Sequence, residues 1–255
     1  MSIFEDLGGF VVIHVPHSST AIPEEYLEGL VVSQADFFEE VRRSADLFVD
    51  EIFEFAFGTT VVAPFSRLAC DVERFLDDEK KTAAARGRGA VYTHAEDGRL
   101  IRKASPKMKS KAVKEIYEPH HQRLTEAVDE ALAKCGRCFL IDGHSFSSDA
   151  LGFPPSSLPS LCLGYDSFHA PPWLVEEAEA IAERCGLDVQ HNHPYSGSIV
   201  PLKHLRQNSN VYSIMIEINK KIYLNEENYT KLDSFSTVKH IINCIISNMI
   251  YRLTL

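Results

Sequence analysis

The sequence contains no apolar run of the roughly 18–20 residues that a helix needs to cross a bilayer. Its first six residues lack the basic region and the apolar stretch of a secretory signal peptide. Cysteine is sparse, with 6 residues, and a chain of 255 residues does not need disulfides to build a stable core. These absences favour a cytoplasmic protein with reduced thiols and no membrane partner.

Positive charge is also scarce, because 26 Lys and Arg residues face 36 Asp and Glu residues. The net charge of −10 leaves no evident basic face, so we expect no nucleic-acid partner. The one basic cluster, Arg99 to Lys114, is interpreted as a solvated loop and helix face, with guidance of an anionic substrate as the alternative. Composition leaves a homo-oligomer open.

Strand and helix patterns alternate along the chain, with no internal repeat or linker between them. Strands are predicted at residues 10–15, 59–64, 138–142, 160–164 and 211–218, and helices from Ser33, from near Ser44, and over residues 106–134, 172–185 and 237–253. This alternation predicts a single α/β domain over residues 1–255. Its sheet should be mixed and mostly parallel, with helices on both faces.

Two of the predicted strands end in histidine-containing polar segments. The strand at 138–142 leads into Gly143, His144 and Ser145, and the strand at 10–15 leads into Pro16 and His17. Parallel strands bring their carboxyl ends to one edge of a sheet, where open α/β sheets bind ligands. A lone histidine there would be interpreted as a turn residue bonded to the backbone. Two together indicate a catalytic metal site, in which zinc takes three protein ligands and a water.

Glu217 interrupts an apolar strand, since it follows Ile214, Met215 and Ile216. A carboxylate is costly to bury unless it is paired, bound to a metal or held at the edge of a sheet. Apolar surroundings raise the pKa of a carboxyl group towards the range of a general base, which is the role predicted here. The alternative is a residue on an edge strand that faces water.

Arginines and further histidines supply candidates for substrate binding. A guanidinium binds a carboxylate through two hydrogen bonds, so an arginine near the sheet edge could select an acidic substrate. For each arginine alone, a surface salt bridge is the alternative. The candidates are Arg67, Arg74, Arg86 and Arg88, together with one of His120 and His121 and the loop histidines His191, His193 and His204. His14 is expected to point to the opposite face from Val15 and is a weaker candidate.

An ordered set of short motifs resembles the N-formylglutamate amidohydrolase family. The motifs run from about residue 10 to 226 and are Val15-Pro16-His17-Ser18, Ala45-Asp46, Arg67-Leu-Ala-Cys-Asp71-Val-Glu73-Arg74, Arg86-Gly87, Tyr117-Glu-Pro-His-His121, Asp142-Gly-His-Ser145, Asn192-His-Pro-Tyr195-Ser-Gly197, Lys203-His204 and Ile216-Glu217-Ile218-Asn219. No single motif is decisive, and the specificity lies in their order.

The resemblance implies a relative of the zinc carboxypeptidases and specific roles for several residues. His17 and His144 would bind zinc with Asp46, at the start of a helix, as third ligand, and Glu73 and Asp71 are the alternatives for that ligand. Glu217 would be the general base, while Arg74 or His204 would stabilise the oxyanion. The residues expected to bind substrate are Arg67, Asp71, Arg86, His121, Asn192 and Tyr195, and those expected to support the metal ligands are Asp142 and Ser145.

The activity that the resemblance implies is hydrolysis of an acidic N-acyl amino acid, first of all N-formyl-L-glutamate, by a zinc-bound water that Glu217 deprotonates. The chain departs from the family pattern at Glu73, Ser198, Lys203 and Met215. These positions are expected to contact substrate, so two alternatives stay open. One is a zinc peptidase or cell-wall amidase, and the other is a non-catalytic protein that binds a small acid on the same scaffold.

Overall fold

The computed structural model describes residues 9–74, 76, 85–149 and 152–254. Its strands are β1 (Val11–Val15), β2 (Thr59–Val62), β3 (Cys138–Phe146), β4 (Leu161–Gly164), β5 (Val189–His191), β6 (Val211–Asn219), β7 (Leu224–Asn225) and β8 (Thr230–Lys231). Its α-helices are α2 (Gln34–Ser44), α3 (Val49–Ile52), α5 (Pro106–Ala112), α6 (Glu118–Cys135), α7 (Pro172–Arg184) and α8 (Phe235–Thr254). The shorter helical segments are η1 (Glu24–Leu27), η4 (Pro155–Ser157), η5 (Lys220–Ile222) and the π-helix η3 (Val113–Tyr117).

The chain divides into two compact units. Unit 1 comprises Met1–Val15, Phe48–Val61 and Leu124–Leu255, and unit 2 comprises Pro16–Leu47 and Val62–Arg123. Each unit has apolar clusters of its own. The single catalytic domain expected over residues 1–255 stays a prediction.

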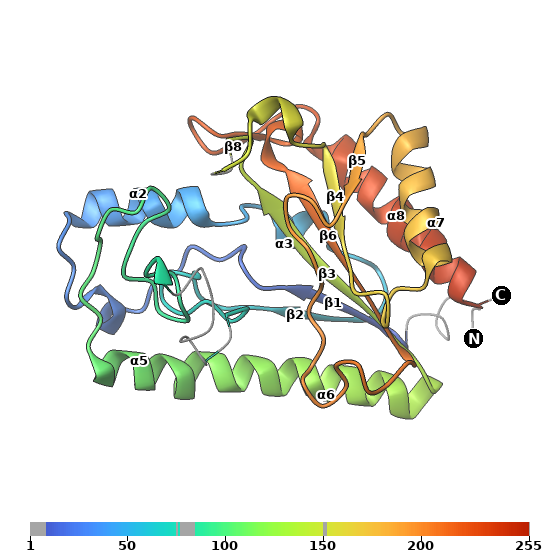
Figure 1. The fold of residues 1–255 in the computed structure, drawn as a ribbon, viewed down its shortest axis with the longest axis horizontal. Coiled ribbons are helices and arrows are strands. Elements are labelled where there is room, and N and C mark those ends of the chain that lie inside the picture. The colour runs from blue at the N-terminus through green and yellow to red at the C-terminus, as the bar shows by residue number, and fades with distance from the viewer. Residues whose placement is uncertain (1–8, 75, 77–84, 150–151, 255) are drawn as a thin grey trace. The chain divides into compact units, whose positions relative to one another are not determined.

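Six strands form one sheet in the order β2-β1-β3-β6-β4-β5 (Figure 1). The pairs β1–β3, β3–β6 and β4–β5 are parallel, while β4 runs antiparallel to β6. The predicted mixed, mostly parallel α/β sheet is therefore confirmed. The two longest strands, β3 and β6, lie inside the sheet with a neighbour on each side, so that their backbone groups are paired along both edges.

Helices cover both faces of this sheet. On one face, α6 packs its apolar residues Leu124 and Val128 against Val12 and Leu140. Burial of a Leu or Val side chain of this kind contributes about 1.5–3 kcal/mol. On the opposite face, the ring of Phe53, which follows α3, lies against Gly143 of β3. Helix α8 packs on both α3 and α7.

Strand β3 is longer than predicted from the sequence. We expected it to end at Asp142 and to leave His144 just beyond it, whereas the strand continues to Phe146. The expectation was wrong because β6 pairs with β3 in register as far as Phe146 and Asn219. Continued pairing with a neighbouring strand keeps the polar end of β3 extended, so His144 lies on the sheet itself.

The helix predicted from near Ser44 begins only at Val49 and is short (α3, Val49–Ile52), so Asp46 does not open a helix. Helix α2 begins as predicted, since the Ser33 hydroxyl accepts the N–H of Asp36 at 3.1 Å, and it ends at Ser44. Ala45 is extended and Phe48 has a left-handed backbone (φ 64°), so the chain turns between α2 and α3. The backbone N–H of Asp46 donates to the carbonyl of His17 at 2.9 Å, which fixes this turn within unit 2.

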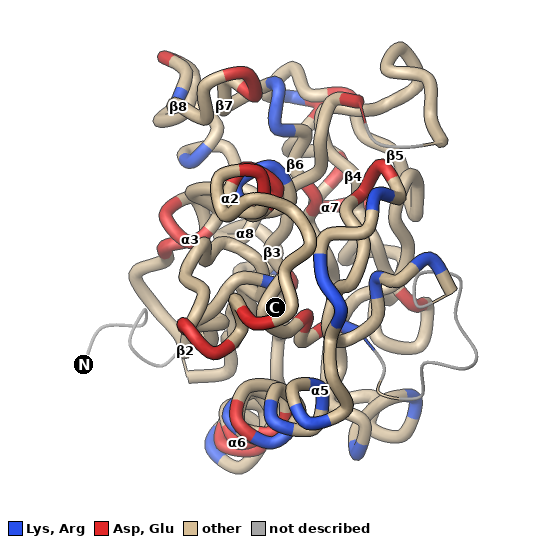
Figure 2. The backbone as a smooth tube through the Cα atoms, turned by 90° about the vertical axis from the view of Figure 1, so that its left-hand side faces the viewer, with Lys and Arg blue, Asp and Glu red and all other residues tan. Residues whose placement is uncertain are grey.

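The basic cluster from Arg99 to Lys114 contains one residue that is not solvated. The lysines of α5 appear blue in Figure 2, and Lys107 and Lys109 are exposed, as predicted for a solvated helix face. Arg102, in contrast, is fully buried, and its guanidinium donates to the carbonyls of Tyr26, Leu68 and Tyr92. A buried arginine of this kind organises loops rather than binding solvent or substrate.

Among the helices that the structure describes, none is both long and apolar enough to traverse a bilayer. The first eight residues, on which part of the cytoplasmic prediction depends, lie outside the described residues.

Candidate active site

His144 and Glu217 lie side by side on the two central strands of unit 1. They are Cα partners in the parallel pair β3–β6, and partners in such a pair project to the same face of the sheet. Both side chains are buried, with exposures of 3% and 7%. Because β6 lies between β3 and β4, the alternative of an edge-strand glutamate that faces water does not hold. The sheet therefore presents a histidine and a carboxylate together.

Asp142 supports the same face through three contacts. Its Oδ1 lies 2.8 Å from Nδ1 of His14 and 3.1 Å from Nε2 of His144, and its Oδ2 accepts the N–H of Ile199 at 3.0 Å. Burial alone would raise the pKa of Asp142, but the neighbouring His144 and His14 lower it below its usual range. An ionised carboxylate only accepts hydrogen bonds, so both histidines carry a proton on the nitrogen that faces it. A neutral His144 then keeps its lone pair on Nδ1.

His17 has the corresponding arrangement in unit 2. Its Nε2 lies 3.0 Å from Oδ1 of Asp71, and its Nδ1 lies 3.7 Å from Oδ2 of Asp46 and 3.7 Å from Oε2 of Glu73. Zinc bonds of about 2.0–2.2 Å allow two ligand atoms of one ion to lie at most about 4 Å apart. The nitrogen of His17 and the oxygen of Asp46 satisfy this limit, so these residues could hold a metal ion.

Asp71 is the centre of a buried polar network in unit 2. Its Oδ2 accepts the hydroxyl of Tyr92 at 2.7 Å and lies 3.1 Å from Nη2 of Arg67 and 3.3 Å from Nε of Arg74. Burial would raise the pKa of Asp71, but Arg67, Arg74 and His17 hold it well below its usual range. Asp71 contacts the opposite ring nitrogen of His17 from Asp46 and Glu73. That position suits a group that orients His17 better than one that shares its metal.

The two arginines beside Asp71 stay charged. Burial would lower the pKa of Arg67, but Tyr92, Asp71 and Asp46 raise it well above its usual value. Asp71 is the largest cause of the raised pKa of Arg74. Both guanidiniums thus combine a fixed orientation with a permanent positive charge, which is what recognition of a carboxylate or an oxyanion requires.

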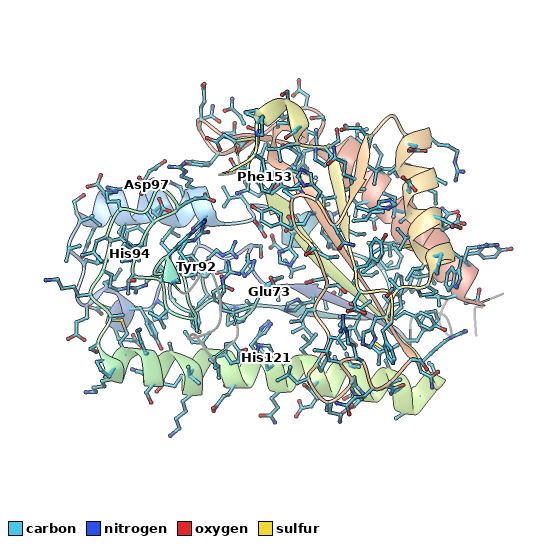
Figure 3. All side chains as sticks on the ribbon, in the orientation of Figure 1. Glu73, Tyr92, His94, Asp97, His121 and Phe153 are labelled. Carbon is cyan, nitrogen blue, oxygen red and sulfur yellow. The ribbon has the colours of Figure 1, made fainter. Side chains whose placement is uncertain are left out.

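Two further residues of unit 2, Arg86 and His121, were predicted to bind substrate, and they lie in different environments. Arg86 is exposed at the surface. The ring of His121 lies on α6 and its Nε2 is 2.7 Å from the carbonyl oxygen of Val72, to which it donates, and this bond holds the segment next to Asp71. Figure 3 labels His121 and Glu73, which both belong to this unit.

In unit 1 the predicted loop residues shape the backbone around β4. The Asn192 side-chain oxygen accepts the N–H groups of Tyr165 and Gly197 at 2.9 and 3.1 Å. The ring of Tyr195, 39% exposed, lies 6.1 Å from that of Phe146. Ser145 is buried on β3 and, by strand alternation, points to the opposite face from His144.

His204 has a local acidic partner. Its Nε2 lies 2.8 Å from Oδ1 of Asp129 on α6, and Lys203 binds the other oxygen of the same carboxylate at 2.5 Å. The structure thus places His204 with Asp129 and Lys203, while Arg74 lies with Asp71 and His17. Of the two cations predicted to stabilise an oxyanion, Arg74 is the one that shares a network with a candidate metal ligand.

The sequence did not indicate the roles of two residues in these networks, Tyr92 and His14. Tyr92 binds Asp71 from 21 positions away, and nothing in the local pattern around it signals this role. His14 was expected to point away from Val15, which it does, but its partner Asp142 lies 128 positions further along the chain. The register of β1 on β3 brings the two together.

Comparisons with known proteins bear on the family and the fold of this chain. Residues 10–224 match the family model described as N-formylglutamate amidohydrolase. A search of curated proteins found no match. The chain is similar to the crystal structure of N-formylglutamate amidohydrolase from Ralstonia eutropha JMP134, with 25% identity and a TM-score of 0.84 over 95% of this chain and 93% of that chain.

A gene product of Agrobacterium tumefaciens shares the fold, with 20% identity and a TM-score of 0.67 over 98% of this chain and 95% of that one. The family model covers most of the chain and agrees with the motifs found in the sequence. The protein is therefore a hydrolase that acts on amide bonds, and it belongs to the N-formylglutamate amidohydrolase family.

Proposed function

We propose that this chain is a zinc-dependent amidohydrolase that removes the acyl group from an acidic N-acyl amino acid, first of all N-formyl-L-glutamate. The observation that carries the proposal is the in-register pair of His144 and Glu217 on neighbouring strands. It sets a candidate metal ligand beside a candidate base on one rigid surface. The structure of the Ralstonia eutropha N-formylglutamate amidohydrolase supports the choice of substrate.

The proposed zinc ligands are Nδ1 of His17, Nδ1 of His144 and a carboxylate oxygen of Asp46. Support comes from the two aspartates, because Asp71 and Asp142 each bind Nε2 of one histidine, which turns Nδ1 of that ring away from the aspartate. The chain itself supports the grouping, since Pro16 alone separates His17 from the end of β1, the strand that pairs with β3. When bound, zinc lowers the pKa of a water from 15.7 to about 7 and polarises the substrate carbonyl.

The residues of the chain would carry the proton and the charge. Glu217 accepts the proton of the attacking water and returns it to the leaving amine, since its carboxylate lies on the same face as His144. Arg74 stabilises the oxyanion, supported by its fixed position beside Asp71. Arg67 and the exposed Arg86 bind the carboxylates of the substrate, with Asn192 and Tyr195 shaping the loop that faces it.

Metal analysis of the purified protein tests the central claim. We expect about one zinc per chain, loss of deformylase activity with a chelator and recovery on adding zinc. Glu217→Gln should keep the zinc but lower kcat by at least about 10²-fold, which is the contribution typical of a general base. Deformylase activity that survives both chelation and Glu217→Gln would overturn the proposal.

The third ligand is tested by a matched pair of variants. Asp46→Asn and Glu73→Gln each remove one carboxylate that lies 3.7 Å from Nδ1 of His17. We expect Asp46→Asn to weaken zinc binding much more than Glu73→Gln, because Asp46 is buried whereas Glu73 is partly exposed. The reverse order would assign the third ligand to Glu73.

A substrate panel decides how far the acidic preference extends. N-formyl-glutamate, N-formyl-glutamine, N-acetyl-glutamate, short peptides and cell-wall fragments should be compared by kcat/KM. We expect kcat/KM for N-formyl-glutamate to exceed that for N-formyl-glutamine by roughly 10–100-fold. The glutamine compound has no side-chain carboxylate to bind the charged arginines. Peptides or cell-wall fragments as better substrates would favour the peptidase or amidase alternative. Tight binding of the acid without turnover by the zinc-loaded protein would favour the binding protein.

A further inference from the structure

His14 is a second imidazole on the aspartate that supports His144. It is 1% exposed and lies on β1, where the register makes it the Cα partner of Asp142 on β3. Its Nδ1 lies 2.8 Å from Oδ1 of Asp142, the same oxygen that lies 3.1 Å from Nε2 of His144. One carboxylate oxygen thus links two histidines on adjacent strands of unit 1.

We propose that His14 is a positioning residue for the metal site: it holds Asp142 in the rotamer that orients His144. The inference rests on the proposed function, in which His144 binds zinc. Neither the motifs that resemble the family nor the expected ligand set includes His14. It deepens the proposed site by adding a group that touches neither metal nor substrate.

The contacts of Asp142 explain why its rotamer depends on His14. The Ile199 N–H binds Oδ2, and the two histidines share Oδ1, so the carboxylate is held at both ends. Asp142 is 1% exposed, and a donor lost from a buried ionised carboxylate is not replaced by bulk water. Without His14, Oδ1 keeps only the donor of His144 among the contacts described, so no group on β1 holds the carboxylate in its rotamer and Oδ1 can shift relative to Nε2 of His144.

The consequence for the metal follows from the ring of His144. Its Nδ1 can face a metal in one orientation only, and the Asp142 bond to Nε2 selects both that orientation and the tautomer. Groups that orient a ligating histidine typically contribute 10–100-fold to metal affinity. A purely structural hydrogen bond between His14 and Asp142 would change the stability of unit 1 and leave the zinc affinity of the folded protein unchanged.

Three substitutions separate these possibilities. His14→Asn places an amide N–H close to the position of Nδ1 and keeps the donor to Asp142. His14→Gln keeps polarity and volume but moves the donor towards the position of Nε2, and His14→Leu removes it. The full-length protein is used throughout, and circular dichroism establishes that each variant is folded.

The measurement is the Kd for zinc, obtained by competition with a chromophoric chelator, alongside the urea midpoint. We expect His14→Leu and His14→Gln to raise the zinc Kd by about 10–100-fold and His14→Asn to stay within about 3-fold of the unmodified protein. If His14→Leu does not fold, the Asn and Gln variants decide the matter between them. Equal zinc affinity in all folded His14 variants would overturn the inference.

Two controls separate this inference from the proposed function. His169 is an equally buried histidine of unit 1 whose ring bonds only backbone groups, at Val211 and Arg206, in the contacts described. His169→Leu should lower the urea midpoint without changing the zinc Kd. His144→Ala should abolish tight zinc binding. If His144→Ala has no effect, the proposed metal site has failed, whereas a loss of affinity in His144→Ala alone overturns the role of His14 and leaves the proposed function standing.

Discussion

Oδ1 of Asp71 lies 3.0 Å from Nε2 of His17, and the other oxygen of the same carboxylate binds Tyr92 and lies within 3.3 Å of Arg67 and Arg74. One buried residue of unit 2 therefore connects a candidate metal ligand to two cations. A substitution at Asp71 should therefore alter the orientation or the electrostatic environment of all of these groups, because each contacts that carboxylate.

Replacement of Asp71 by Asn should affect both metal binding and stability. The variant removes the nearest counter-charge of two partly buried guanidiniums, which should cost about 1–3 kcal/mol, and it weakens the orientation of His17. We expect a lower urea midpoint and a zinc Kd raised by roughly 10–100-fold, measured by denaturation and by chelator competition. Tyr92→Phe is the matched control, because it removes one hydrogen bond to the same oxygen but no charge. A larger loss of zinc affinity in Tyr92→Phe than in Asp71→Asn would contradict this interpretation.

Gly143 separates Asp142 from His144 at a point where β3 has no room for a side chain. A Cβ at this position would lie 2.9 Å from ring carbons of Phe53. Overpacking of this kind usually costs about 1–3 kcal/mol, so Gly143→Ala should lower the free energy of unfolding by that amount. Phe53→Leu in the Gly143→Ala background should recover part of the loss, which a double-mutant cycle in urea measures. Strictly additive effects of the two substitutions would show that Phe53 is not the obstacle.

Arg102 should be essential for the stability of unit 2. Burial lowers the pKa of Arg102 to about 10. This value is still well above 7, so the guanidinium stays charged at neutral pH. Its donors meet three carbonyls, and a buried carbonyl without a donor costs about 1–3 kcal/mol. We expect Arg102→Met to cost at least about 3 kcal/mol by urea denaturation, and Arg99→Met, at an exposed position, to stay within about 0.5 kcal/mol of the unmodified protein. Comparable losses in the two variants would refute the role assigned to Arg102.

The cysteines should divide into two classes by their reactivity. Burial raises the pKa of Cys70 and Cys138 to about 12 and that of Cys162 to about 11, so below about pH 10 these three thiols stay mostly protonated. Only the thiolate reacts with a disulfide reagent, so at pH 8 we expect modification of the exposed Cys135 and Cys185, with slower modification of Cys244.

At pH 8 the thiols of Cys70, Cys138 and Cys162 should react only when urea unfolds the protein. In the native protein their reaction should appear only as the pH approaches 11. Mass spectrometry of the labelled peptides gives the count. Rapid labelling of Cys138 in the native protein would contradict this division, because Cys138 is buried.

Several features of this protein follow from the sequence by itself. The sequence predicts strands of the sheet where apolar runs lead into His17 and His144. It also places one acid, Glu217, within an apolar strand. These features can be read from the sequence because strand patterns are local. The family also follows from the sequence, since the match of residues 10–224 to the family model depends on residue identity and spacing alone.

The tertiary structure decided what depends on pairing between distant segments. The continuation of β3 through His144 required its neighbour β6, and the turn at Asp46 required a bond to the carbonyl of His17. The burial of Arg102 among carbonyls and the union of His14 with Asp142, 128 positions apart, arise from packing and register. Periodicity and composition report the environment of a residue along the chain, and partners of this kind are set only when strands and loops from remote parts of the sequence meet.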